Sequence, residues 1–221
     1  MKKSDTFTLR EGFSFQPVPQ DKREFMNGRT FHENKHIGYD DLSYLNVKYY
    51  DFEHHIAQGE MVVNRKLAHD VLEIFAELFD AGYELEKVRL CDCYDGDDDR
   101  CMQDNNTSSF NYRVIADTDT LSLHALGMAV DINPLYNPYI VGEKVMPPEG
   151  VQYCNRELAF AHKIDHNDIC FKIFAAHGWS WGGDWINSKD YQHFYKDVSN
   201  PVKTAVKGVV RAVKRAAADN G

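Results

Sequence analysis

Two histidines and one aspartate are the residues of this chain best suited to chemistry. His124 and Asp131 lie seven positions apart in Ser-Leu-His-Ala-Leu-Gly-Met-Ala-Val-Asp, and His193 follows 62 positions later in Asp-Tyr-Gln-His-Phe. Two imidazoles and one carboxylate form the donor set of a catalytic zinc ion, which takes three protein ligands and leaves the fourth position to water. The pattern therefore predicts one Zn²⁺ held by these side chains at a hydrolytic site.

Two further charged residues supply the other parts of such a reaction. Zinc peptide hydrolysis needs a carboxylate that moves a proton from water to the leaving amine. It also needs a cationic or hydrogen-bonding group that stabilises the oxyanion. Asp190, three residues before His193, is the candidate general base, and Arg113 is the candidate contact for the oxyanion or a substrate carboxylate. A free aspartate has a pKa of about 3.9, so burial must raise the pKa of Asp190 for this role.

Each of these residues taken alone also has a plainer interpretation. The chain has 10 histidines, and a single histidine is more often a surface or hydrogen-bonded residue than a ligand. Arg113 could be a salt-bridge partner only, and Ser122 could cap a turn. Asp131 is different, because a carboxylate in the apolar run Ala-Val-Asp-Ile is costly unless it is paired or bound to a metal.

The five cysteines leave a second possibility open. Cys91, Cys93 and Cys101 could hold another metal, but their spacing matches no common zinc template. An odd number of cysteines argues against a disulfide scaffold. The interpretation we prefer is that these are ordinary strand and loop cysteines.

Length and charge narrow the class of protein. The 221 residues fit one domain with extensions, and 43% hydrophobic residues provide for a core. A net charge of −9 gives no support for nucleic-acid binding. The first ten residues have no apolar run, so they predict no signal peptide, and the sequence leaves the localisation open.

Hydrophobic periodicity and turn residues predict the elements around these residues. The predicted helices cover residues 64–78 and 168–177, with a turn or short helix at 122–129. The predicted strands cover residues 88–93, 110–115, 130–132 and 191–195, and residues 42–52 are predicted to be a short strand or a packed loop. Loops are predicted at residues 95–109, at 133–150, where four prolines lie, and at the glycine-rich 178–185.

The two ends of the chain differ from the middle. Residues 1–45 are predicted to be an N-terminal extension packed on the domain, irregular over residues 1–40. Residues 199–221 form a basic amphipathic tail with valines on one helical face. Such a helix could make weak contact with an anionic membrane or wall surface, or it could pack on the domain.

Three segments together resemble the VanY-type zinc peptidases. The signature Ser-x-His-x-x-Gly-x-Ala-x-Asp followed by a distant acid-x-x-His is filled at every fixed position by 122–131 and 190–193, and 178–185 is similar too. That superfamily contains D-alanyl-D-alanine carboxypeptidases and L-alanyl-D-glutamate endopeptidases. The resemblance covers about residues 59–194, which places a zinc peptidase domain at residues 46–198.

The resemblance implies a fold, a set of roles and a substrate class. The fold is α+β and Hedgehog/DD-peptidase-like, with a small antiparallel sheet and packed helices. The implied roles are zinc at His124, Asp131 and His193, general base at Asp190, oxyanion or substrate contact at Arg113, and substrate contacts at Ser122 and Trp181. The expected protein is a monomer that hydrolyses peptidoglycan stem peptides at the cell wall.

Two questions stay open at the level of sequence. The bond could be the one cut by a D,D-carboxypeptidase or the one cut by an L-Ala-D-Glu endopeptidase. The alternative to an enzyme is a non-catalytic zinc-containing module that binds wall peptides or a protein. The presence of both Asp190 and Arg113 favours the enzyme.

Overall fold

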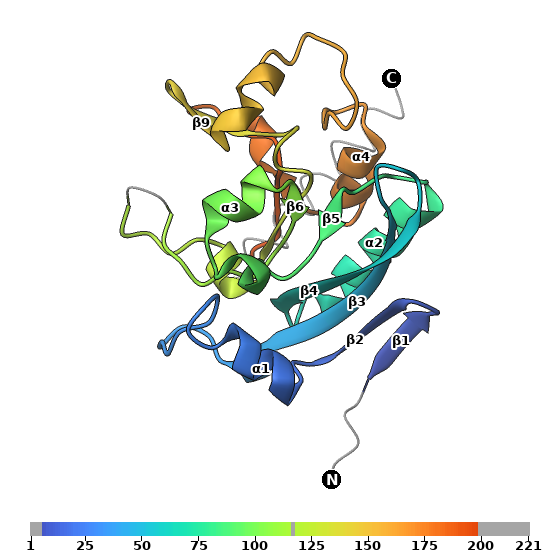
Figure 1. Cartoon of the computed structure of the whole chain (residues 1–221), viewed down its shortest axis with the longest axis vertical. Helices are drawn as coiled ribbons and strands as arrows, with labels where there is room; N and C mark the ends of the chain where they lie inside the picture. Colours follow the sequence, from blue (N-terminus) through green and yellow to red (C-terminus); the bar gives the residue numbers. More distant parts are fainter. Residues whose placement is uncertain (1–5, 116–117, 199–221) are drawn as a thin grey trace, which may run out of the picture.

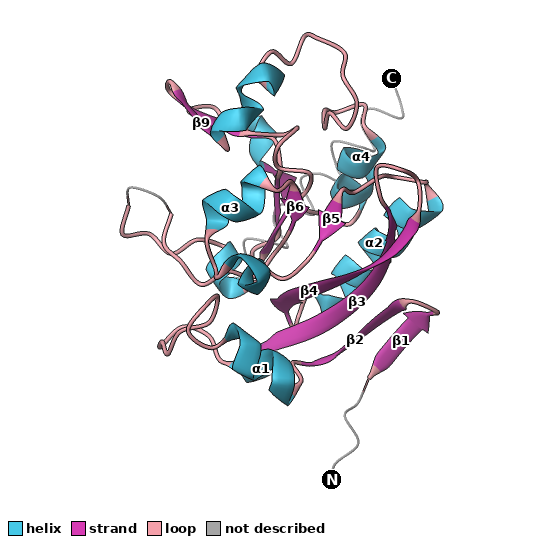
Figure 2. Ribbon diagram, in the orientation of Figure 1, coloured by secondary structure: helices cyan, strands magenta, loops and turns pink. Residues whose placement is uncertain are grey.

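The computed structural model describes residues 6–115 and 118–198, which form small sheets with short helices packed against them (Figure 1, Figure 2). Its sheets are β1-β2-β3-β4, β10-β12-β7, β11-β8-β9 and β5-β6, and only the last pair is parallel. The helices are α1 (Gln20–Met26), α2 (Ala68–Asp80), α3 (Asp98–Gln103) and α4 (Ile169–Ala176). The strands are β1 (Phe7–Arg10), β2 (Phe13–Pro17), β3 (Leu42–Tyr50), β4 (Ile56–Asn64), β5 (Lys87–Val88), β6 (Asn106–Thr107), β7 (Ala129–Asp131), β8 (Tyr139–Val141), β9 (Lys144–Met146), β10 (Ser180–Trp181), β11 (Lys189–Asp190) and β12 (His193–Tyr195). The predicted α+β class is confirmed at this level.

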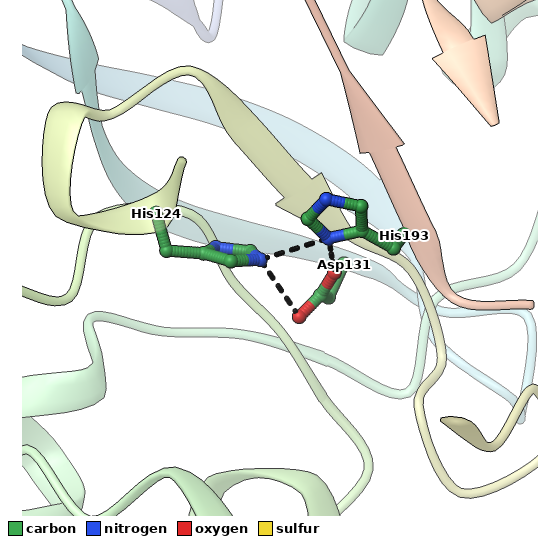
Figure 3. A group of neighbouring side chains, drawn as sticks. All are labelled: His124, Asp131 and His193. Carbon is green, nitrogen blue, oxygen red and sulfur yellow. Dashed lines mark hydrogen bonds and ion pairs between the residues drawn. The ribbon is translucent and has the colours of Figure 1, made fainter. Parts of the chain in front are cut away.

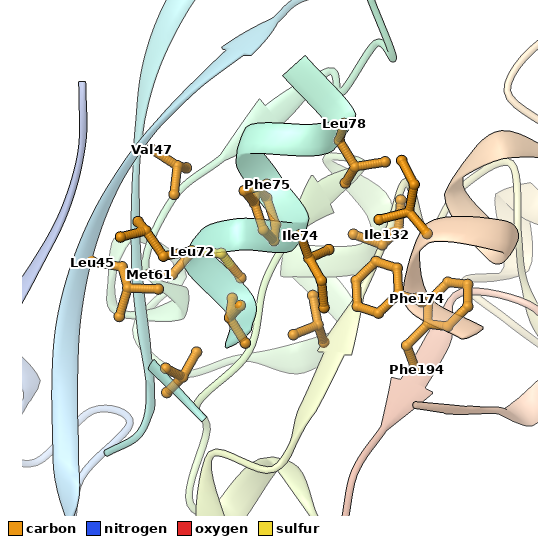
Figure 4. Packing of buried hydrophobic residues seen from close by; sticks show 14 of the residues in the cluster. Leu45, Val47, Met61, Leu72, Ile74, Phe75, Leu78, Ile132, Phe174 and Phe194 are labelled. Atoms are coloured by element: carbon orange, nitrogen blue, oxygen red, sulfur yellow. The ribbon is translucent and has the colours of Figure 1, made fainter. Parts of the chain in front are cut away.

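Helix α2 is the centre of the main core. Its buried face packs against Leu45 and Met61 of the four-stranded sheet on one side and against Phe174 of α4 and Phe194 of β12 on the other (Figure 4). Burying each such side chain contributes about 1.5–3 kcal/mol of stability. Because α2 packs on both sides, it links the N-terminal sheet to the strands that carry the metal-ligand candidates. The prediction of a helix over 64–78 is confirmed with a later start, because Asn64 still belongs to β4.

The N-terminal segment is more regular than the sequence predicts. Residues 1–40 were expected to be irregular, but β1, β2 and α1 lie within them. Strand β2 pairs antiparallel with β3, and Phe13 at its start is buried in the main core. Every residue of β1 is exposed, so its strand form depends on hydrogen bonds to β2 rather than on hydrophobic alternation. The predicted boundary at residue 45 lies inside β3, and the division into extension and domain stays a prediction.

Several local predictions in the middle of the chain are wrong. The strand predicted over 88–93 ends at Val88 and is followed by a 3₁₀ helix, Cys91–Tyr94. No strand is assigned to residues 110–115. Leu90 and Phe110 are buried in a second small core instead, and Val114 makes only an isolated bridge with Leu121. The predicted loop at 95–109 contains α3 and β6.

The proline-rich stretch is also more regular than expected. Residues 133–150 contain the hairpin β8–β9, in which Val141 pairs with Lys144. Gly142 in its two-residue turn has a φ of +57°, the backbone conformation that tight hairpin turns need and glycine adopts easily. The predictions of strands at 42–52, 130–132 and 191–195, of a helix at 168–177 and of a short helix within 122–129 are confirmed by β3, β7, β12, α4 and the 3₁₀ helix His124–Leu126.

The basic tail at residues 199–221 lies outside the described residues. Within the part of the chain that is described, none of the helices is long and apolar enough to span a membrane.

Candidate metal centre

Two imidazoles and one carboxylate converge where β7 and β12 run side by side (Figure 3). Nε2 of His124 lies 3.0 Å from Nδ1 of His193 and 3.2 Å from Oδ2 of Asp131. Nδ1 of His193 lies 3.0 Å from Oδ1 of Asp131. All three residues are buried, and their ligand atoms lie within 4.8 Å of one another. The structure therefore brings together the three residues that the sequence predicts as metal ligands.

Strand register and one tight turn place these side chains. Asp131 pairs directly opposite His193 in the antiparallel ladder, and residues in such pairs present their side chains on the same face. His124 begins a 3₁₀ helix that ends at Gly127. Gly127 has a φ of +63°, and a Cβ atom there would lie 2.5 Å from the backbone nitrogen of Asn64. The turn that leads from one ligand to the next strand therefore requires glycine.

The backbone of Ser109 fixes the orientation of one imidazole. Nδ1 of His124 lies 2.6 Å from the carbonyl oxygen of Ser109. Because a carbonyl can only accept, Nδ1 donates the proton, and in the neutral imidazole Nε2 keeps the lone pair that a metal ion would take. Histidines that bind metals usually donate their second ring nitrogen in this way.

Neighbouring charges shift the pKa values of two of these residues, Asp131 and His124. Burial raises the pKa of Asp131, but the two imidazoles outweigh burial and hold it far below its usual range. Burial lowers the pKa of His124, and Asp131 raises it by more. Two imidazole nitrogens and an ionised carboxylate are the donors that zinc takes in three-ligand catalytic sites. The residues present thus fit one zinc ion.

The cavity next to these residues has a volume of about 470 Å³. Its wall includes the three ligand candidates together with Arg113, Ser122, Asp190, Gln192 and Trp185. The sequence predicts four site residues outside the ligand set. Asp190, Arg113 and Ser122 line the cavity, and Trp181 does not.

Asp190 has the properties expected of a proton acceptor beside the ligands. Its Oδ1 is shielded from solvent and has no hydrogen-bond partner. Burial and the charge of Asp131 raise the pKa of Asp190 to about 7, although His193 and Arg113 oppose this. Gly182 packs against it so closely that a Cβ on the glycine would lie 2.7 Å from Cβ of Asp190. Position 182 therefore has no room for a side chain beside Asp190.

Arg113 is already engaged by a carboxylate that the sequence did not single out. Its Nη2 lies 2.6 Å from Oδ2 of Asp98 on α3, while its Nε is buried without a partner. Burial lowers the pKa of the guanidinium, but Asp98 and Asp131 raise it by more. Ser122 is buried in the cavity wall, where its Oγ accepts a hydrogen bond from the backbone N–H of His124 at 3.2 Å.

The tryptophan prediction needs a correction. Trp181 is 4% exposed, belongs to the main core and donates its indole N–H to the carbonyl of Tyr191. It does not line the cavity, because its side chain packs between α4 and β12. Trp185 does line it, with its ring centroid 5.5 Å from that of His193. Trp185 therefore replaces Trp181 as the candidate substrate contact.

Sequence reasoning missed two other parts of the cavity. Gln192 is 1% exposed, lines the cavity and has an unpartnered Oε1. The sequence signal that could have identified Gln192 is its position between Asp190 and His193. The acidic run at 97–99 forms part of the rim, but its lack of hydrophobic periodicity made it resemble a loop.

A second group of possible ligands is made up of Asp70, Glu73 and His177. Asp70 already accepts from Lys196, His177 and the indole of Trp179 at 2.7–2.8 Å. The ammonium group of Lys196 already supplies the positive charge beside Asp70. We therefore interpret this group as an ion cluster that links α2 to the end of α4 and to the residue after β12.

Comparison with known proteins agrees with this geometry. Residues 116–196 match the family model of D-alanyl-D-alanine carboxypeptidases. The matched stretch contains all three ligand candidates and Asp190, so the resemblance to VanY-type zinc peptidases is confirmed. No curated protein and no solved structure matches the chain. The match supports a peptidoglycan-related peptidase in general terms.

Proposed function

We propose that this protein is a zinc-dependent peptidase that hydrolyses peptidoglycan stem peptides, on a Hedgehog/DD-peptidase-like fold. The observation that carries the proposal is that three candidate ligands and a carboxylate with an unpartnered oxygen line one cavity, within the stretch that matches the carboxypeptidase family. The bond would be that of a D,D-carboxypeptidase or of an L-Ala-D-Glu endopeptidase.

His124, Asp131 and His193 would hold the zinc ion. Zinc bound by such ligands lowers the pKa of water to about 7 and polarises a carbonyl group. The chain itself contributes the geometry: Ser109 holds one imidazole, and the register of β7 and β12 holds the other two ligands. A hydrogen-bond partner such as the Ser109 carbonyl fixes the ring orientation of a metal-binding histidine.

Asp190 would act as general base and then as general acid. Its Oδ1 has no other partner to compete for a proton. A pKa of about 7 lets one carboxyl group take a proton from the attacking water and return it to the leaving amine near neutral pH. The positive charge of a nearby metal lowers this pKa, which favours the ionised form that starts the reaction.

Arg113 would stabilise negative charge on the substrate. The residue lines the cavity, and its Nε is buried without a hydrogen-bond partner. The ion pair with Asp98 fixes the guanidinium plane, and a fixed donor costs little reorganisation when the oxyanion forms. Ser122 and Trp185 would contact the substrate on either side.

The direct test is digestion of defined muropeptides by purified zinc-loaded protein, with products identified by mass spectrometry. We expect either release of terminal D-alanine or cleavage between L-alanine and D-glutamate, and loss of both in the presence of a chelator. The product masses decide between the two bonds.

The matched control is Asp190→Asn, which keeps the shape of the side chain. We expect it to retain zinc and to lose most turnover. If zinc-loaded wild type binds muropeptides but yields no product, the protein is a non-catalytic binding module and the peptidase proposal fails.

A further inference from the structure

Two buried cysteines near the cavity lie unusually close together. Sγ of Cys91 is 3.2 Å from Sγ of Cys101, and both residues belong to a small buried cluster with Tyr94. Within the described residues, Cys93, Cys154 and Cys170 are also free thiols. Cys93, two positions from Cys91, is exposed. The sulfur pair is therefore a feature of the fold and not of the local sequence Cys-Asp-Cys.

We propose that Cys91 and Cys101 form a disulfide site that joins the 3₁₀ helix Cys91–Tyr94 to α3. A disulfide has sulfur atoms about 2.0 Å apart, so closing the observed gap needs a movement on the order of 1 Å. Both residues lie in short helices whose side chains already face each other. This inference does not rest on the proposed function.

The bond would act on the wall of the cavity. Helix α3 carries Asp98, which holds Arg113, and Met102, which lines the cavity. This helix is only six residues long, and so short a helix is marginal without tertiary contacts. A covalent link at Cys101 would hold α3 in place, so Arg113 would keep its partner when the surrounding loop fluctuates.

The chemistry balances with a disulfide oxidant such as oxidised glutathione. One cysteine attacks the glutathione disulfide as a thiolate and forms a mixed disulfide, releasing one reduced glutathione. The second cysteine displaces the other glutathione, so one Sγ–Sγ bond forms, the glutathione bond breaks and two glutathione thiols result. The hydrogen bond with Cys101 and burial both raise the pKa of Cys91 well above its usual value, so the bond should form during folding faster than in the folded protein.

The test uses the full chain refolded in a glutathione redox buffer. We expect the five thiols of the reduced chain to fall to three, with loss of the mass of two hydrogen atoms. Trypsin cleaves after Arg89, Arg100 and Arg113, which puts the two cysteines into separate peptides, 90–100 and 101–113. Without reductant these peptides should appear linked.

Matched variants identify the cysteine involved, because Cys91 and Cys93 share a peptide. The linked peptides should persist in Cys93→Ser and disappear in Cys91→Ser. The proposal is overturned if all five thiols remain in the wild type, or if the link follows Cys93 instead. Peptide mapping of the wild type with fragmentation between residues 91 and 93 gives the same answer even if a variant does not fold.

A separate measurement tests whether the disulfide stabilises α3. Amide hydrogen exchange over residues 98–103 should be slower in the oxidised wild type than in the reduced wild type, and the urea midpoint should be higher. Equal exchange in the two forms would contradict the role assigned to the bond.

Discussion

Asp98 and Arg113 form an ion pair of 2.6 Å at the wall of the cavity, with both side chains 28% exposed. The pair connects α3 to the segment that leads into the first metal-ligand candidate. Its carboxylate comes from an acidic run that looks unstructured in the sequence, so the guanidinium is oriented by a residue that no motif marks.

Replacing Asp98 by asparagine should impair catalysis without removing the metal. The variant loses the charge that orients the guanidinium but keeps the side-chain shape. We expect kcat to fall about 10-fold, which corresponds to about 1.4 kcal/mol, with zinc content unchanged. Asp99→Asn makes the same change one residue further along α3 and is the matched control. Equal effects of the two substitutions would show that only the charge of the rim matters.

Asp131→Asn should separate metal binding from folding. The amide cannot supply the anionic donor, so we expect zinc affinity to fall by at least about 100-fold. In the wild type, removing zinc with a chelator should lower the melting temperature, because a ligand that binds only the folded state stabilises it. The variant should melt at the same temperature with and without chelator. A chelator-sensitive melting temperature in the variant would mean that the metal binds elsewhere.

The two tryptophans should give opposite phenotypes. Trp181→Ala removes a buried ring from the core, and we expect it to lower the free energy of unfolding by about 3–5 kcal/mol. Trp185→Ala removes a half-buried ring from the cavity wall, so it should mainly raise KM with a much smaller loss of stability. Urea unfolding and steady-state kinetics on both variants check this. A stable Trp181→Ala variant with a raised KM would restore the original sequence prediction.

The ion cluster between α2 and the end of α4 should make stability depend on pH. Burial lowers the pKa of His177, but Glu77 and Asp70 raise it by more. A raised folded pKa contributes stability below the unfolded value of about 6.5, and this stability is lost as pH rises through the folded pKa. Burial raises the pKa of Asp70, but Lys196 and His177 lower it by more. The stability that Asp70 contributes is therefore lost at acidic pH.

Urea unfolding between pH 5 and 9 measures the histidine contribution. The free energy of unfolding of the wild type should decline above about pH 6.5. His177→Gln should remove that part of the decline, because glutamine does not titrate. An identical pH profile for the two proteins would show that His177 does not stabilise the fold through its charge.

The sequence was most informative where chemistry restricts the choice of residue. His124, Asp131 and His193 could be predicted because few arrangements of imidazole and carboxylate suit a metal. The apolar stripe of α2 and the strand around Asp131 could be predicted from periodicity. In these cases each part of the signal lies within a short segment, although the segments that hold Asp131 and His193 lie 62 positions apart.

Features that depend on distant pairing could not be predicted in the same way. Strand β1 is exposed throughout and pairs with β2, which is itself held by pairing with β3 further along the chain. Trp181 and Trp185 are both aromatic residues of one glycine-rich loop, and only the packing of α4 and β12 decides which of them faces the core. The closeness of Cys91 to Cys101 likewise follows from the meeting of two short helices.

The register of β7 against β12 has a consequence for the order of events in folding. Because side chains alternate between the faces of a strand, a slip of one residue would turn His193 away from Asp131. The three proposed ligands can therefore meet only after the last strand of the described chain has paired in its final register. Time-resolved zinc uptake during refolding would measure the rate of that step, and the proposed hydrolysis could not begin before the step is complete.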